Sequence, residues 1–425
     1  MVEKWKDVAI APADILLPAP FVDLSAWAVV ACDQYTSQPE YWQGVEDVVG
    51  EMPSTLHITL PEMYLGQSDV RVPKIHETME KYLKEGILKE VVSKGFILTE
   101  RTTQSGSRLG LIAAVDLEGY DFQQGSRSMV RATEGTILSR IPPRLKVREN
   151  APLESPHVLL LLDDIQRTVI EPLYHLRDSL TPLYDVELMA EGGHVKGWEV
   201  TEPALVQGVY NALIALKQKL PADNPLLMAV GDGNHSLATA KAHWENVKQS
   251  LPADDAKLHP ARFALAEVEN IHDEALLFHP IHRVVFHVDG GALLYDWAAY
   301  CKGRGMTLAD TASASGGHEI TVLYGSDEKR VTVIHPEASL PVGTLQKFLD
   351  DYLSRHPEAE IDYIHGENTV KDLCKKPGTV GFLVPGLDKS ALLPAVRQDG
   401  ALPRKTFSMG EAHEKRYYME CRRIL

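Results

Sequence analysis

Residues 226–248 constrain the fold of this chain more than any other stretch. Residues 226–230 are uninterrupted and apolar, which predicts a buried strand. The sequence Gly231-Asp232-Gly233 then indicates a tight turn, because glycine adopts positive φ and lets other groups approach the backbone closely. From Ser236 onward, apolar residues recur at the spacing of one helical face. The sequence therefore predicts a strand, a glycine turn and a helix.

This arrangement is a candidate anion-binding site. The free N–H groups of a helix's first turn, together with the helix dipole, favour negative charge. Asp232, Asn234, His235 and Ser236 all fall at that one place. The alternative is that Asp232 or Asn234 only caps the helix and that His235 is a partly buried bystander. The spacing alone is compatible with both interpretations.

The composition is that of an ordinary soluble globular protein, and its charge narrows the choice of partners. A net charge of -16 at pH 7 argues against nucleic acid or an anionic membrane as the partner. The first residues carry early charges and prolines instead of the apolar stretch of a signal peptide, and we expect a cytoplasmic protein without membrane spans. The cysteines form no CxxC pair, so neither a zinc or iron–sulfur cluster nor a disulfide framework is expected; they are Cys32, Cys301, Cys374 and Cys421.

A basic cluster stands out in this acidic chain. Guanidinium groups suit phosphate and carboxylate recognition because their forked donors bind two oxygens at once. Pro142-Pro143 is expected to break any helix through the cluster, so its spacing does not place the arginines on one face. The alternative is a solvated basic surface paired with Glu134, Glu149 and Glu154. The basic residues between 129 and 156 are Arg131, Arg140, Arg144, Lys146 and Arg148.

The remaining pattern predicts a mixed α/β (α+β) protein with soft boundaries near residues 1–125, 126–290 and 291–425. Residues 72–94 have helical periodicity. Asp163 and Asp164 follow a predicted strand, where α/β proteins often place chemistry, although a turn or helix cap explains them equally well. His279, His282 and His287 invite a metal site, but three-residue spacing on a strand points neighbouring side chains to opposite faces. His282 and Arg283 are better explained as an anion or substrate contact or as a structural pair, and Lys405 is expected to belong to a basic lid.

Four stretches together carry a resemblance to a known family. They are RATEGT at 131–136, GDGNHSLATAK at 231–241, HPIHRVV at 279–285 and LPRKTFSM at 402–409. In this order they resemble the bacterial and archaeal family of unknown function DUF1015, over nearly the whole chain. The usual central motif of that family, Asp-Gly-His-His-Arg after a strand, is similar to one in the ParB and sulfiredoxin superfamily, which includes the free serine kinases.

The resemblance implies a ParB/sulfiredoxin-like core with additional α/β regions and a phosphate-handling site. Asp232, Gly233 and His235 match the motif, whereas Asn234 replaces its first histidine and Ser236 its arginine. The lost arginine implies a different substrate, a cation supplied elsewhere in the chain, or no phosphotransfer. Glu134 matches the glutamate of a His-Glu pair and is the candidate base that the resemblance implies.

The hypothesis that follows is a nucleotide-dependent small-molecule kinase or phosphotransferase-like enzyme using ATP or ADP and Mg²⁺. Glu134, Asp232 and His235 are its candidate catalytic residues, and Asp232 is also the candidate Mg²⁺ ligand. The alternatives are a non-catalytic nucleotide or metabolite-binding protein and a metal-dependent hydrolase that uses Asp163, Asp164 and the histidines around a metal. The oligomeric state stays open. The candidate phosphate- or substrate-binding residues are Arg131, Thr136, Arg140, Arg144, Arg148, Gly233, Asn234, Ser236, His282, Arg283 and Lys405.

Overall fold

The computed structural model describes residues 2–31, 35–310 and 316–425, which form two compact units. The first unit comprises residues 1–277 and 410–425, and the second comprises residues 278–409. The second unit is therefore an insertion, and the chain returns to the first unit for its last segment. These boundaries differ from the three consecutive regions expected from sequence, because return of a chain to an earlier unit leaves no mark in local sequence patterns.

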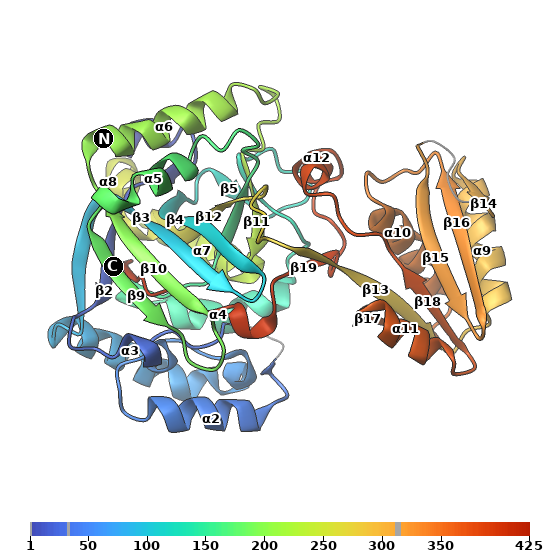
Figure 1. Ribbon diagram of the computed structural model, residues 1–425, viewed down its shortest axis with the longest axis horizontal. Coiled ribbons are helices and arrows are strands. Elements are labelled where there is room, and N and C mark those ends of the chain that lie inside the picture. Colours follow the sequence, from blue (N-terminus) through green and yellow to red (C-terminus); the bar gives the residue numbers. More distant parts are fainter. Residues whose placement is uncertain (1, 32–34, 311–315) are drawn as a thin grey trace. The chain divides into compact units, whose positions relative to one another are not determined.

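The first unit is built on an 11-stranded mixed sheet. Its main path is β5-β6-β11-β8-β12-β4-β3-β10-β9, with β1 paired to β4 and β2 paired to β3 (Figure 1). The strands are β1 Ile10–Ala11, β2 Ala13–Pro18, β3 Leu88–Thr103, β4 Gly106–Asp116, β5 Tyr120–Asp121, β6 Val130–Ala132, β8 Leu159–Leu162, β9 Pro182–Glu187, β10 His194–Val200, β11 Met228–Asp232 and β12 Phe263–Asn270.

Helices cover both faces of this sheet. On one face the apolar sides of α6 (Pro203–Lys217) and α7 (Asn234–Lys248) pack into a core with β8, β11 and alternate residues of β12. On the other face α3 (Ser68–Lys84) packs on β2 and β3. The helix expected over 72–94 thus ends at Lys84, because the chain turns at Gly86 with φ 69° and continues as β3. The mixed α/β class expected from sequence is confirmed.

The other helices of the first unit are short or peripheral. They are α1 Val2–Trp5, α2 Pro39–Val49, α4 Ile141–Arg148, α5 Glu171–His175 and α8 Ala253–Leu258. A two-stranded sheet of β7 (Leu153–Glu154) and β20 (Arg422–Arg423) joins the middle of the chain to its last residues. Contrary to expectation, the prolines do not break α4. Pro142 and Pro143 lie in its first turn, where the helix loses no backbone hydrogen bond.

The second unit has a seven-stranded sheet of its own, in the order β14-β16-β15-β18-β13-β17, with β19 paired to β13. Trp297, Phe348 and Phe382 pack together on one side of it. Its strands are β13 Phe278–Phe286, β14 Thr307–Ala309, β15 His318–Tyr324, β16 Asp327–Ile334, β17 Glu360–His365, β18 Thr379–Leu383 and β19 Phe407–Met409. Its helices are α9 Gly290–Gly303, α10 Pro341–Arg355, α11 Glu367–Cys374 and α12 Lys389–Asp399.

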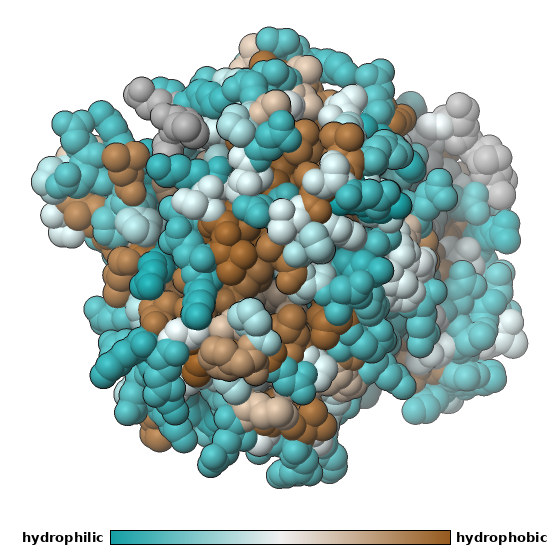
Figure 2. Space-filling model, turned by 60° about the vertical axis from the view of Figure 1, so that its left-hand side comes forward, coloured by the Kyte–Doolittle hydropathy of each residue, from teal (hydrophilic) through white to brown (hydrophobic). Residues whose placement is uncertain are grey.

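Figure 2 shows one face of the molecule, on which hydrophilic residues predominate toward the outside and hydrophobic residues gather in groups toward the middle. Across the described ranges, no helix combines the length and the apolar character needed to cross a membrane. Cys301, Cys374 and Cys421 are buried free thiols, and Cys32 lies outside the described residues.

Candidate functional site

The strand–turn–helix predicted at residues 226–248 is confirmed as β11, Gly233 and α7. Gly233 has φ 78°, and a Cβ atom there would lie 2.4 Å from the carbonyl oxygen of His157. Only glycine satisfies both constraints without strain. No side chain caps α7, so its first-turn N–H groups are not closed off by a capping oxygen.

Two of the sequence motifs meet at this turn because β6 and β11 are parallel neighbours, with Val130 opposite Met228 and Ala132 opposite Val230. Residues that follow β6 therefore lie beside residues that follow β11. The Thr133 hydroxyl donates to the carbonyl oxygen of Val230 at 2.6 Å, and the backbone N–H of Thr133 donates to Asn234 Oδ1 at 3.2 Å.

His235 and Glu134 take part in the same junction. The N–H of Ile137 donates to Nε2 of His235 at 3.3 Å, which leaves the proton of a neutral ring on Nδ1. Glu134 is half-buried in the loop between Thr133 and Ile137. The same loop holds Thr136, whose buried hydroxyl has no hydrogen-bond partner. The pairing of β6 with β11 thus brings the candidate base and the glycine turn to one edge of the sheet.

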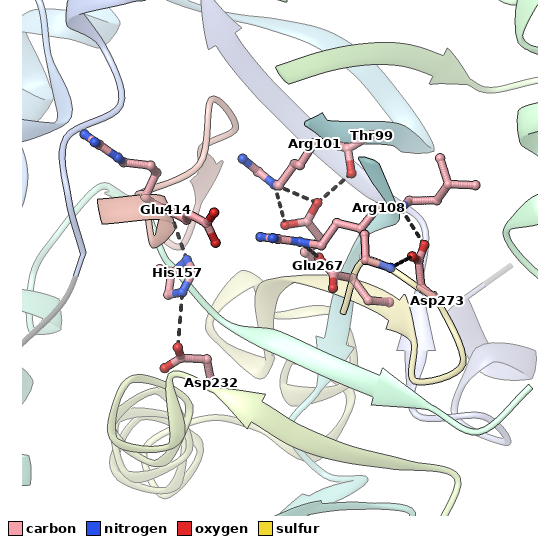
Figure 3. Close-up of polar contacts among 12 residues, drawn as sticks. Thr99, Arg101, Arg108, His157, Asp232, Glu267, Asp273 and Glu414 are labelled. Carbon is pink, nitrogen blue, oxygen red and sulfur yellow. Dashed lines mark hydrogen bonds and ion pairs between the residues drawn. The ribbon is translucent and has the colours of Figure 1, made fainter. Parts of the chain in front are cut away.

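Asp232 is the last residue of β11, and its pKa is strongly shifted by its neighbours. Its Oδ1 accepts from the N–H of Gly233 at 2.7 Å, and its Oδ2 lies 2.7 Å from Nζ of Lys415. Figure 3 shows the contact of Asp232 with His157, whose Nε2 lies 3.7 Å from Oδ2. Burial opposes ionisation, but Lys415 and His157 outweigh it and hold the pKa of Asp232 well below its usual range. Its side chain remains 28% exposed. Asp232 is therefore an anion that other groups can still reach.

His157 and Lys415 are site residues that the sequence motifs did not indicate. The Nδ1 atom of His157 lies 2.9 Å from the carbonyl oxygen of Arg416, which accepts only, so Nδ1 carries a proton. Nε2 of His157 is buried without a hydrogen-bond partner. Lys415 lies 183 positions after Asp232 in the chain. No local pattern connects residues this far apart, and only the fold brings them together.

The arginines of the basic cluster are largely engaged by the protein itself. Arg131 is buried and donates to the carbonyl oxygens of Ser126 and Ser128 and to Asn224 Oδ1. Arg144 forms an ion pair with Glu62, and Arg148 forms one with Glu154 at 2.6 Å.

The last two candidates near the turn are more accessible. Arg140 is exposed just before α4, and Ser236 is exposed in the first turn of α7.

His282, Arg283 and Lys405 belong to the second unit. Arg283 is fully buried and donates to the carbonyl oxygens of Ile281, Arg404 and Lys405, and its Nε donates to Gln346. Nδ1 of His282 accepts from the N–H of Val384 at 3.3 Å, and burial lowers the pKa of this imidazole. In this unit Arg283 binds backbone oxygens around Lys405.

A second polar cluster lies on the central strands of the first unit (Figure 3). Glu267 of β12 accepts from the Thr99 hydroxyl at 2.5 Å and from Arg101 at 2.9 Å, and Arg108 donates to Glu269 at 2.8 Å. Leu159 of β8 is opposite Glu267 of β12 and, across a β-bulge between Val230 and Asp232, opposite Asp232 of β11. The two clusters are thus about two strand spacings apart, roughly 10 Å.

This second cluster has more carboxylates than guanidinium groups. Glu420 joins it through a hydrogen bond from Tyr184. Burial raises the pKa of Glu269 to about 7 and that of Glu420 to about 7. Each has a buried oxygen, Oε2, without a hydrogen-bond partner. The nearby Arg101 instead holds the pKa of Glu267 below its usual range, although burial opposes it.

The aspartates considered for a metal-dependent hydrolase have protein partners. Asp164 accepts from the N–H groups of Thr168 and Val169, as a turn cap does. Asp163 contacts His272 at 2.7 Å. Among the described residues, no group of three or more His, Cys, Asp or Glu side chains is arranged to hold a metal ion.

The chain belongs to the family described as protein of unknown function (DUF1015), which it matches over residues 13–352. The family expected from the four sequence motifs is thereby confirmed. Lys415 and Arg416 lie beyond the matched residues. No curated protein matches the chain.

Several solved structures overlap loosely with this one. A conserved hypothetical protein from Pyrococcus furiosus is 11% identical, with a TM-score of 0.35 over 70% of this chain and 90% of that one. A free serine kinase in complex with AMP is 10% identical, with a TM-score of 0.36 over 69% and 88%. SbnI with a C-terminal truncation, from Staphylococcus aureus, is 11% identical, with a TM-score of 0.37 over 70% and 82%. Overlaps this loose assign neither a ligand nor an activity to this chain.

Proposed function

We propose that this protein is a nucleotide-dependent small-molecule phosphotransferase whose phosphate-binding element is the N-terminus of α7. The observation that carries the proposal is the parallel pairing of β6 and β11, which sets the loop that holds Glu134 beside a helix N-terminus that no side chain caps. Phosphoryl transfer needs positioning and positive potential around the phosphates more than covalent help from the protein. A helix N-terminus after a glycine turn supplies both.

In the proposed reaction, the acceptor is a hydroxyl group of a small molecule. Its oxygen forms the new bond to phosphorus while the bond from phosphorus to the bridging oxygen of the donor nucleotide breaks. Glu134 takes the hydroxyl proton, and the N–H groups between Gly233 and Ser236 hold the phosphate oxygens. His235, whose Nε2 is occupied by the N–H of Ile137, orients the acceptor through Nδ1–H.

Mg²⁺ is the cation that usually accompanies such phosphates, and it is commonly bound by one or two carboxylates in addition to them. Asp232 fits this role because it is ionised, part-exposed and adjacent to the α7 N-terminus. Its oxygens contact Gly233 and Lys415, and each carboxylate oxygen has a further lone pair. The ion would neutralise charge that develops on the transferred phosphoryl group.

Nucleotide binding is tested by thermal-shift measurements with ATP and ADP, each with and without Mg²⁺. We expect an upward shift for the wild-type protein that is lost in Asp232→Ala. Asp163→Ala is the matched control, because it removes a part-exposed carboxylate at the end of the neighbouring strand β8. A well-folded wild-type protein that no nucleotide stabilises would contradict the proposal.

Catalysis is tested separately with Glu134→Gln. We expect this variant to keep its nucleotide affinity and to lose turnover by about 100-fold or more, the usual contribution of a general base. The measurement is nucleoside diphosphate release from ATP in the presence of candidate hydroxyl compounds. Nucleotide binding without turnover in the wild-type protein would favour the alternative of a non-catalytic binding protein, to which the replacement of the motif's arginine by Ser236 also points.

A further inference from the structure

The segment that follows the second unit returns to the candidate site. Residues 410–425 belong to the first unit, and Glu414, Arg416 and Tyr418 are buried there. Arg416 donates to the carbonyl oxygen of Ala190 at 2.8 Å, and the Tyr418 hydroxyl donates to that of Val158 at 2.6 Å.

Further along the segment, Glu420 accepts from Tyr184, and Arg422 donates to Glu154 at 2.8 Å. The segment is thus fixed to the first unit on both sides of Tyr418.

Lys415 is held within this fixed segment. Its carbonyl oxygen accepts from the N–H of Ala31 at 2.8 Å, and its Nζ lies 2.7 Å from Asp232 Oδ2. The side chain is 19% exposed. The next residue, Arg416, fixes His157 through its carbonyl oxygen, and Nε2 of His157 is a buried atom without a hydrogen-bond partner. Two consecutive residues of the segment therefore shape the surroundings of Asp232.

The first turn of α7 has no cation of its own. Residues 231–236 carry no arginine or lysine, and the next cationic residue of the helix, Lys241, contacts Leu117 and Glu245. Of the arginines between 129 and 156, Arg131, Arg144 and Arg148 are committed to protein partners, whereas Arg140 is exposed just before α4. The ammonium group of Lys415 lies 2.7 Å from the carboxylate of Asp232, which is two residues before the first residue of α7. An ammonium group binds phosphate as a point charge and needs no fixed fork geometry.

We propose that Lys415, carried by the C-terminal segment, is the phosphate-binding cation of this site and that Asp232 is its positioning residue. The inference rests on the proposed nucleotide site and adds the residue that gives it positive charge. In the free protein the ammonium group is held by Asp232. On binding it contacts the nucleotide phosphates while the carboxylate keeps it in place.

Isothermal titration with ATP, ADP, AMP and adenosine, in the absence of Mg²⁺, tests this role. We expect Lys415→Met to weaken ATP binding by about 10-fold or more and adenosine binding by less than about twofold, because only the phosphates contact the ammonium group. Lys415→Arg keeps the charge and is expected to retain most of the affinity. Lys241→Met is the matched control, since its ammonium group is similarly shielded, ion-paired and on α7 itself.

The outcomes separate this inference from the proposed function. If none of the nucleotides binds to the wild-type protein, the proposed function is wrong. ATP binding that is equal in wild type and Lys415→Met would overturn only the role of Lys415, as would equal losses for ATP and adenosine. Circular dichroism establishes that each variant is folded, and Lys415→Gln replaces the methionine variant where that variant is not.

The positioning role of Asp232 is tested by a double-mutant cycle. If the carboxylate acts through Lys415, Asp232→Asn weakens ATP binding in the wild-type background but adds little to Lys415→Met. Additive losses would contradict the positioning role. The same titrations without Mg²⁺ keep any metal-binding role of Asp232 out of the comparison.

Discussion

Gly233 is the residue whose backbone is most tightly specified at the candidate site. Its φ of 78° and the 2.4 Å approach of a Cβ to the carbonyl oxygen of His157 both exclude a side chain. We predict that Gly233→Ala lowers the free energy of unfolding by about 2–4 kcal/mol, from the left-handed backbone and the steric contact together. Urea titrations monitored by circular dichroism measure this change in the free energy of unfolding.

Gly208→Ala is the control for this substitution. Gly208 lies on the exposed side of α6, and a Cβ there meets nothing within 4 Å. Alanine should stabilise that helix by about 0.5–1 kcal/mol. Equal effects of the two substitutions would show that the turn tolerates a side chain, and the site geometry derived from Gly233 would then be wrong.

The sequence alone was sufficient to identify Gly233 and Asp232 as site residues, but not the residues that contact Asp232 in the fold. Glycine turns and helix periodicity are local, so residues 226–248 were sufficient to predict them. His157 lies two residues before strand β8, and Lys415 follows the second unit in the sequence. Nothing in a run such as HEKRYYME marks its lysine as the partner of a carboxylate 183 positions earlier. The ionic environment of Asp232 is a property of the fold.

Among the elements, β12 carries a testable electrostatic feature. Burial raises the pKa of Glu269 to about 7, above its value in an unfolded chain. The folded protein therefore binds more protons than the unfolded chain between about pH 4.5 and 7. The stability contributed by the protonated carboxyl is complete below that window, is lost as pH rises through it, and stays lost above it.

We predict that Glu269→Gln removes this loss, because the amide imitates the protonated carboxyl at every pH. From pH 5 to pH 8, the free energy of unfolding of the variant should rise relative to that of the wild type by on the order of 2 kcal/mol. Urea titrations at four pH values measure it, and Glu274→Gln is the control because Glu274 is exposed. Parallel pH profiles for wild type and Glu269→Gln would contradict the raised pKa.

The elements also show where periodicity fails. The apolar spacing of residues 72–94 continues past Lys84, although the backbone changes from helix to strand after Gly86. Short apolar runs are compatible with both the helical and the strand periodicity. Only the pairing of β3 with β2 and β4 decides between helix and strand here. In α4 the error was the reverse: Pro142 and Pro143 look like breakers but occupy the first turn, where proline is favoured.

For the whole molecule, the second unit closes on itself. Its first strand, β13, pairs with its last, β19, with Phe278 opposite Met409 and Pro280 opposite Phe407. The ends of residues 278–409 therefore meet within the unit. Its core includes Trp297, which is fully buried, and a helix-covered sheet of seven strands. A segment with its own core and adjacent ends has what an independent domain needs.

We therefore predict that residues 278–409 fold when produced alone. Trp297 is the one tryptophan of this segment, so its fluorescence reports this core directly. Urea should produce a single cooperative transition, with the loss of Trp297 burial and of far-ultraviolet circular dichroism coinciding. Trp297→Phe is the control: it should lose the tryptophan fluorescence and keep the unfolding transition that circular dichroism detects. A segment with an exposed Trp297 and no cooperative transition would mean that the fold of the second unit depends on residues 1–277 and 410–425, and its closure through β13 and β19 would not suffice.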